Sequence, residues 1–198
     1  MSGKSSFDDY EFFFEQNVHF GSRTIMIGTP YSYSDEDHNV NFHVASNVIK
    51  GLHLLCLNSN EPITIKLNTF GGCWNSSLAI YDAIREARLQ CRVIIKGMGA
   101  VMSAGPFILQ AATPGYREVY PNTSLMLHDG GNGFEGNARD FEKWADWSAF
   151  QRNQSYKMLS DAAGEKTDFW RKKLVNDYIF TAEKALELNL VDTIINLD

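Results

Sequence analysis

Residues 62–90 read PITIKLNTFGGCWNSSLAIYDAIREARLQ, and this stretch decides the fold class. Apolar and polar residues alternate over 62–68, which is the pattern of a β-strand. The pair Gly71 and Gly72 then marks a tight turn, and residues 77–90 have the apolar spacing of a helix. The stretch therefore predicts a strand, a turn and a helix in direct succession.

The same succession continues on both sides of this stretch. Residues 97–112, GMGAVMSAGPFILQAA, predict a glycine-rich turn followed by an apolar helix, with Ser103 at the junction. Strands that alternate with helices predict an α/β fold with largely parallel crossovers. The other predicted elements are strands at 23–28, 92–98 and 118–128, helices at 43–58, 138–163 and 167–177 (the last with Thr167 or Asp168 as N-cap), and a short helix capped by Thr181 before a final strand.

Length, net charge and cysteine content limit the classes of protein to which the chain can belong. A chain of 198 residues fits one domain, and its net charge of −6 argues against nucleic acid or an anionic membrane as the main partner. Residues 1–20 lack the architecture of a signal peptide, and no window approaches the length of a membrane span. The three cysteines have no metal-type spacing and fit a reducing compartment such as the cytoplasm; they are Cys56, Cys73 and Cys91.

The polar segment 29–42 contains the one run that resembles a metal site. Its acidic residues and a histidine stand close together, but a charge run of this kind is more typical of a solvated loop than of a ligand set. We therefore expect no metal and no cofactor. The run comprises Asp35, Glu36, Asp37 and His38.

Three features together indicate nucleophilic chemistry. Ser103 is predicted at the start of an apolar helix, where backbone N–H groups favour a developing negative charge. His128 ends an apolar strand before a glycine-rich loop, where it could serve as a general base. The Gly71–Gly72 turn could bring an unhindered N–H to a substrate carbonyl. Taken singly, each feature is more often plain packing.

A Ser-His pair of this kind needs a carboxylate to orient the histidine. Periodicity does not choose among the acidic residues that could supply it, so the residues alone indicate an α/β domain with possible hydrolase chemistry. The candidates are Asp129, Asp140, Asp168, Asp177 and Asp192.

The chain resembles the ClpP family, the proteolytic subunits of the Clp machinery. The resemblance covers about residues 20–194 and rests on LNTFGGCWNSSLAIYD (67–82), the segment 97–112, YPNTSLMLH (120–128) and NDYIFTAEKALELNLVDTI (176–194). It implies a ClpP/crotonase-like spiral of β-β-α units. The segment GFEGNARDFE (133–142) resembles the start of the family's protruding strand–helix handle. We accordingly expect an N-terminal segment at 1–20 and a peptidase domain at 21–198.

The resemblance also assigns roles. It implies Ser103 as nucleophile, His128 as general base and acid, and Asp177 as the orienting carboxylate, at intervals of 25 and 49 residues. An ungapped match from the glycines would put Val101 at the nucleophile position, but the downstream interval selects Ser103. The implied oxyanion donors are the backbone N–H groups of Ala104 and Gly72, with Gly71 as the alternative to Gly72.

The family further implies unfolded polypeptide substrates, homo-oligomeric heptameric rings stacked in pairs, and a Clp-type ATPase partner. Two positions depart from its pattern: Phe70 replaces the usual proline before the glycines, and Asn176 replaces an arginine linked to contacts between rings. One competing reading is a catalytically silent ring subunit. A crotonase-type acyl-CoA enzyme ranks third, because the chain has no convincing basic set for CoA.

Overall fold

The structure is a computed structural model, and it describes residues 13, 15–28, 39–131 and 133–197. Most of the expected N-terminal segment lies outside the described residues. The acidic run at 35–38 lies outside them as well.

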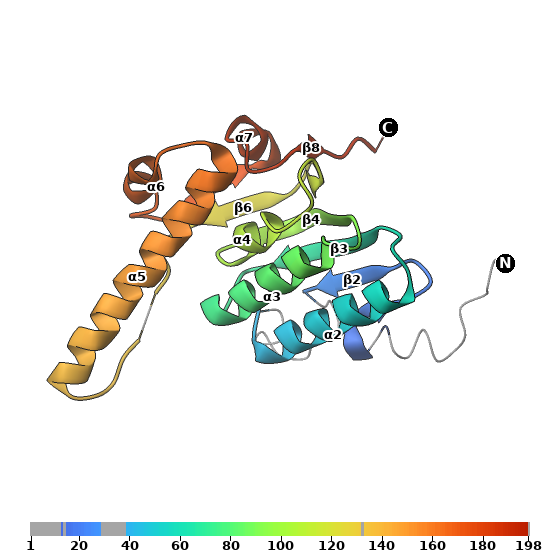
Figure 1. Cartoon of the computed structure of the whole chain (residues 1–198). Coiled ribbons are helices and arrows are strands. Elements are labelled where there is room, and N and C mark those ends of the chain that lie inside the picture. Colours follow the sequence, from blue (N-terminus) through green and yellow to red (C-terminus); the bar gives the residue numbers. More distant parts are fainter. Residues whose placement is uncertain (1–12, 14, 29–38, 132, 198) are drawn as a thin grey trace.

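A single eight-stranded sheet forms the centre of the fold (Figure 1). The pairings β2–β3, β3–β4, β4–β5, β4–β6 and β5–β8 are parallel, whereas β1–β2 and β6–β7 are antiparallel. The largely parallel sheet predicted from the alternation of strands and helices is therefore confirmed. Its strands are β1 (Val18–His19), β2 (Thr24–Ile27), β3 (Ile63–Thr69), β4 (Val93–Met102), β5 (Arg117–Val119), β6 (Ser124–Leu127), β7 (Tyr178–Thr181) and β8 (Thr193–Ile194).

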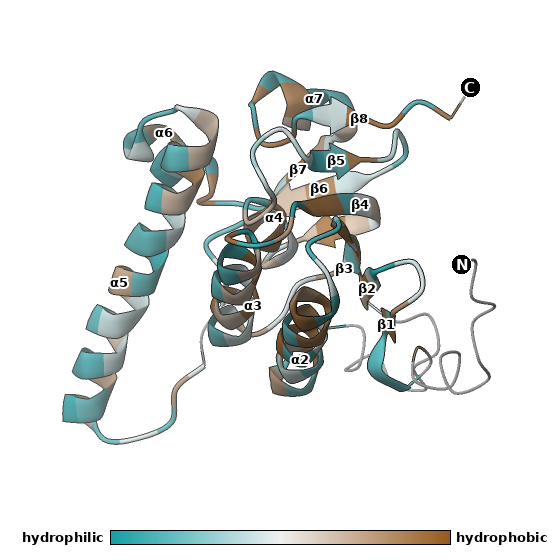
Figure 2. Cartoon of the chain, turned by 45° about the vertical axis from the view of Figure 1, so that its right-hand side comes forward, coloured by the Kyte–Doolittle hydropathy of each residue, from teal (hydrophilic) through white to brown (hydrophobic). Residues whose placement is uncertain are grey.

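Two amphipathic helices, α2 (Phe42–Asn58) and α3 (Trp74–Ala87), lie side by side against the sheet (Figure 1). The Asn41 side chain caps α2 by accepting from the N–H of Val44. Much of the hydrophobic colour in Figure 2 lies in α2 and in β4. The core between the layers is fully buried and includes Leu55, Ile63, Ile65, Leu67, Ile80, Ile84 and Ile95.

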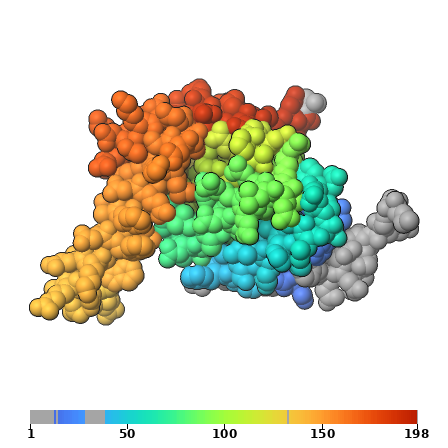
Figure 3. Space-filling view, viewed as in Figure 1, coloured from blue at the N-terminus to red at the C-terminus, as the bar shows by residue number. Residues whose placement is uncertain are grey.

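Helix α5 (Ala138–Ala163) has the bounds that the sequence predicts. Asn137 caps its start, and Gly164 ends it in the left-handed conformation. Its N-terminal part projects away from the body of the molecule (Figures 1 and 3). The described residues of the preceding segment 129–136 form no strand, so the handle is a helix reached by a glycine-rich connection. Helix α6 (Thr167–Lys173) packs beside the C-terminal half of α5, and α7 (Ala182–Glu187) begins after its predicted cap, Thr181.

The segment around Ser103 differs from the prediction. The sequence places a turn at 97–102, but β4 continues to Met102 and helix α4 (Gly105–Leu109) has only five residues. Leu67 pairs with Gly97 and Thr69 with Val101, so β4 holds two more residues than β3 over this interval. The Asn68 side chain accepts from the N–H of Ala100 at 3.0 Å and satisfies the irregular backbone there. The irregularity absorbs the longer interval before Ser103.

Two further boundaries differ for local reasons. The strand predicted over 118–128 is divided into β5 and β6, because Pro121 cannot donate to a ladder and a turn closes from Tyr120 to Thr123. Helix α6 takes its N-cap from Lys166 rather than from Thr167 or Asp168, and no side chain caps it.

Candidate active site

Ser103 lies between β4 and α4 in a backbone conformation that residues other than glycine rarely adopt. Its φ is +55°, in the left-handed region. The adjoining strand fixes this conformation, because the N–H of Ser103 donates to the carbonyl of Met126 on β6 at 2.8 Å. The backbone therefore sets the direction of the Ser103 side chain.

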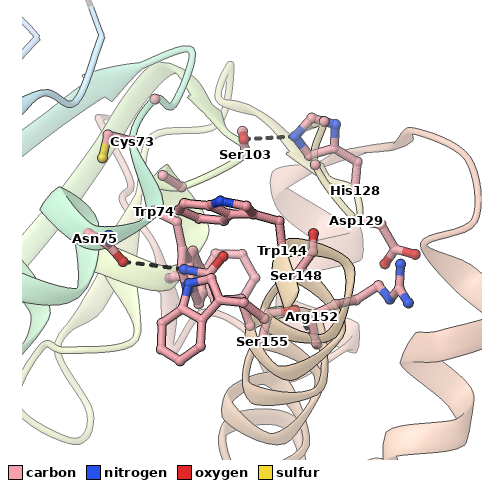
Figure 4. A pocket seen from close by; sticks show the side chains of 17 residues that line it. Cys73, Trp74, Asn75, Ser103, His128, Asp129, Trp144, Ser148, Arg152 and Ser155 are labelled. Atoms are coloured by element: carbon pink, nitrogen blue, oxygen red, sulfur yellow. Dashed lines mark hydrogen bonds between the residues drawn. The ribbon is translucent and has the colours of Figure 1, made fainter. Parts of the chain in front are cut away.

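His128 follows β6 directly and meets two predicted partners. Its Nε2 lies 2.7 Å from Ser103 Oγ (Figure 4), and its Nδ1 lies 3.3 Å from Asp177 Oδ1. The sheet register explains the second contact: Leu127 pairs with Tyr178 across the antiparallel β6–β7 ladder, so the next residue of one strand faces the preceding residue of the other. The three predicted side chains are thus brought together in one line.

The carboxylates that the sequence left open have other partners. Asp129 accepts from the Tyr156 hydroxyl at 2.6 Å, and Asp192 pairs with Arg117 at 2.6 Å. Asp140 and Asp168 form ion pairs within their own helices. The Asp177 side chain is 65% exposed, so it faces His128 from the surface of the chain and not from a buried position.

The glycine turn after β3 lies against Ser103. The N–H of Gly71 donates to Thr69 Oγ1 at 3.1 Å. Among the described residues, no protein acceptor takes the N–H of Gly72 or that of Ala104. Gly72 is therefore the freer donor of the two glycines.

Both glycines are required by close approach. A Cβ added at Gly71 would stand 2.4 Å from Ser103 Cβ, and one at Gly72 would stand 2.3 Å from the carbonyl oxygen of Val40. Their φ angles, +107° and +142°, also disfavour any side chain. The turn can lie against Ser103 only because these positions lack side chains.

A cavity of about 550 Å³ opens beside Ser103 and His128 (Figure 4). The start of α3 forms one wall and α5 the other, and Gln151 Nε2 donates to Asn75 Oδ1 across it at 3.3 Å. The rings of Trp74 and Phe107 pack in an edge-to-face arrangement. The aromatic and polar side chains of the cavity include Trp74, Phe107, Trp144, Trp147, Ser148 and Arg152.

Cys73 lines the cavity immediately after Gly72. Burial opposes ionisation of its thiol, but hydrogen bonds from the Ser76 side chain and from the backbone of Ser76 and Asn75 outweigh this and lower its pKa. Cys56 on α2 and Cys91 after the end of α3 differ, since their Sγ atoms lie 3.7 Å apart. Burial, followed by the contact with Cys91, raises the pKa of Cys56 to about 11.

The sequence does not reveal the contribution of α5 to this cavity. Trp144 and Trp147 are 53% and 47% exposed, so they do not belong to a buried helix face whose period could be recognised. Their position among charged residues of a long helix is the only signal in the sequence. Arg152 and Asp129 also line the cavity. The sequence indicates Asp129 only as a candidate orienting carboxylate, and no sequence pattern indicates Arg152.

The described ranges contain no group of three or more histidine, cysteine or acidic side chains arranged to hold a metal ion. No helix of the described part of the chain has both the length and the apolar character needed to cross a bilayer.

Comparison with known proteins gives a consistent result. A family model described as Clp protease matches residues 23–198. The ATP-dependent Clp protease proteolytic subunit 2 of Corynebacterium efficiens is 32% identical over 147 residues, which are 73% of each chain. Subunit 1 from Corynebacterium jeikeium is 30% identical over 72% of this chain and 76% of its own length. Among solved structures, a mutant of ClpP1 from Listeria monocytogenes matches with a TM-score of 0.78 and 28% identity, over 89% of this chain and 93% of that one.

Proposed function

The chain belongs to the Clp protease family, and from this premise we propose that it is an active serine endopeptidase subunit. Ser103 is the nucleophile, His128 the general base and acid, and Asp177 the orienting carboxylate. The observation that carries the proposal is the 2.7 Å contact between Ser103 Oγ and His128 Nε2, with Asp177 at the opposite ring nitrogen. Residues 21–198 form the peptidase domain.

The reaction follows from this arrangement. His128 Nε2 takes the proton of Ser103 as the hydroxyl oxygen attacks a peptide carbonyl. The N–H groups of Gly72 and Ala104 then donate to the oxyanion; within the part of the chain that the structure describes, neither N–H has a protein acceptor, so both are available for this bond. The imidazolium gives its proton to the leaving amine, and water activated by His128 releases the acyl group from Ser103.

Asp177 holds the tautomer in which Nδ1 carries the proton, so that Nε2 is free to accept one. Its negative charge also stabilises the imidazolium. The exposed cavity between α3 and α5 receives the peptide. No metal or cofactor takes part in this scheme.

The proposal extends to partners. The chain assembles with copies of itself into rings, and the substrates are unfolded polypeptides. An ATPase of the Clp type delivers them, which the names of the Corynebacterium relatives support by calling those proteins subunits of an ATP-dependent protease. The three cysteines are free thiols, which suits work in the cytoplasm or another reducing compartment.

Labelling with a fluorophosphonate tests the proposal most directly. We expect one label per chain, located at Ser103 by peptide mapping, and cleavage of short fluorogenic peptides by the same preparation. Ser103→Ala should abolish both signals, whereas Ser22→Ala, far from the cavity, should change neither. Native mass measurement on the same sample should give a particle many times the 22.4 kDa of one chain. An assembled wild type that remains unlabelled and inactive would establish the silent ring subunit instead.

A further inference from the structure

Asp129 stands directly after His128, yet its carboxylate has a partner of its own. Its Oδ1 accepts a hydrogen bond of 2.6 Å from the hydroxyl of Tyr156 on α5. Tyr156 is 2% exposed and belongs to the hydrophobic core. The scheme above uses neither residue, although together they link the chain beside His128 to the long helix.

The segment that leaves His128 has little else to hold it. The paired residues of β6 end at Leu127. Gly130 and Gly131 follow Asp129, and a Cβ added at either would meet no atom within 4 Å. A chain of glycines in open surroundings has many conformations available to it. The Asp129 side chain therefore provides a fixed point at the end of β6.

The link also has chemistry that makes it persistent. Burial, followed by the hydrogen bond to Asp129 and the charge of Asp129, raises the pKa of Tyr156 to about 12, although Arg152 and Arg171 act in the opposite direction. The hydroxyl therefore remains a donor across the pH range in which proteins are assayed. A hydrogen bond to an ionised carboxylate is shorter and stronger than one between neutral groups.

We infer that Tyr156 and Asp129 are positioning residues for His128. By holding the end of β6 against α5, the bond keeps Nε2 within reach of Ser103 Oγ while Nδ1 faces Asp177. It also keeps the Asp129 carboxylate on Tyr156, away from the ring nitrogen that Asp177 occupies. This inference rests on the proposed role of His128 in catalysis.

Removal of the hydroxyl alone is the sharpest perturbation. Tyr156→Phe keeps the buried ring, and Asp129→Ala removes the acceptor. Asp129→Asn keeps an oxygen that can accept from the hydroxyl and serves as the conservative rescue. Tyr116→Phe is the matched control, because Tyr116 does not line the cavity and its ring lies against Arg92.

Each variant is reacted with a fluorophosphonate, which gives two separate quantities. The final label per chain counts competent sites, and the second-order rate constant reports the reactivity of Ser103 in each site. Tyr156→Phe and Asp129→Ala should each lower the rate constant about tenfold, as expected for loss of one hydrogen bond to a charged group, with the final label unchanged. In peptide assays kcat should fall in parallel while KM stays constant. The double variant should be no slower than the slower single variant, and Asp129→Asn should recover most of the rate.

Two results would overturn the inference while the proposed function stands. One is a wild-type rate constant in Tyr156→Phe. The other is a lower final label with an unchanged rate constant, which would mean that the bond only holds the fold together. A wild type that takes no label at Ser103 would remove the proposed function and this inference with it.

Discussion

Replacement of Gly71 by alanine tests whether the glycine turn sets the position of Ser103, the proposed nucleophile. The added Cβ would stand 2.4 Å from Ser103 Cβ, 2.9 Å from the Met102 carbonyl oxygen and 3.0 Å from the Ala104 nitrogen. Real Cβ atoms essentially never approach other atoms within 3.0 Å, so Ser103 or the turn must move by at least about 0.6 Å. These neighbours are backbone or lie next to it, so a simple rotamer change cannot relieve the contact.

The displacement predicts the size of the effect. A misplacement of about 1 Å at a reacting group lowers the rate by about a hundredfold, so we expect Gly71→Ala to lower kcat/KM by ten- to a hundredfold. The variant also places a side chain at a φ of +107°, which destabilises the fold by about 1–3 kcal/mol.

Gly115→Ala is the matched control for the backbone strain. Gly115 has a φ of +88°, and a Cβ there would meet nothing within 4 Å. Its unfolding free energy in urea should fall by a similar strain term, while its kcat/KM should stay within about twofold of wild type. A Gly71→Ala protein that folds and cleaves a fluorogenic peptide within threefold of the wild-type rate would refute the reasoning, because the turn would then not determine where Ser103 stands.

Asp177→Asn should lower kcat by a factor between about a hundred and the roughly 10⁴ that loss of the charge of a triad carboxylate can cost, whereas Asp168→Asn, on a surface helix, should have little effect in the same peptide assay. Partial burial raises the pKa of Asp192, but the hydrogen bonds and charge of Arg117 outweigh burial and lower this pKa. The Arg117–Asp192 pair therefore stabilises the fold at pH values above the carboxyl's ordinary pKa of about 4. This contribution to stability disappears as the pH falls through the lowered pKa of Asp192. Urea unfolding of Asp192→Asn should accordingly show a shallower loss of stability on acidification than wild type, and equal slopes would contradict the assignment. Iodoacetamide should alkylate Cys73 before Cys56 or Cys91, because Cys73 is exposed and has a lowered pKa, whereas Cys91 is buried and Cys56 has a raised pKa. Peptide mapping checks the order of alkylation. The loss of peptide cleavage should follow the modification of Cys73.

The sequence predicts the strands and long helices well, because their apolar spacing is set by the sheet and the core that bury it. The sequence predicts the local structure around Ser103 less well. The number of residues between the glycine turn and Ser103 does not reveal which residues pair across the sheet. In β4, two residues have no paired position on β3. An ungapped count consequently points to Val101, which is buried in the strand. In the structure, the contact with His128 and the left-handed backbone conformation distinguish Ser103 from Val101.

The proposed orienting carboxylate could not be chosen from periodicity for a related reason. Asp129 is adjacent to His128 in sequence, but its side chain turns to Tyr156. Asp177 lies 49 residues after His128 and is brought beside it because it directly precedes β7 in the β6–β7 register. The sequence also did not predict that α5 lines the cavity, because the exposed aromatic residues of this helix do not belong to a buried helix face. Long-range pairing, and not local pattern, assembles this site.

The left-handed backbone at Ser103 also restricts how this position can change through evolution. Threonine carries a hydroxyl, but its branched Cβ crowds a positive φ. Glycine and asparagine accept the conformation and offer no nucleophile. With the proposed role of Ser103, serine and, as a thiol, cysteine are therefore the small unbranched side chains that combine reactivity with tolerable strain at this position.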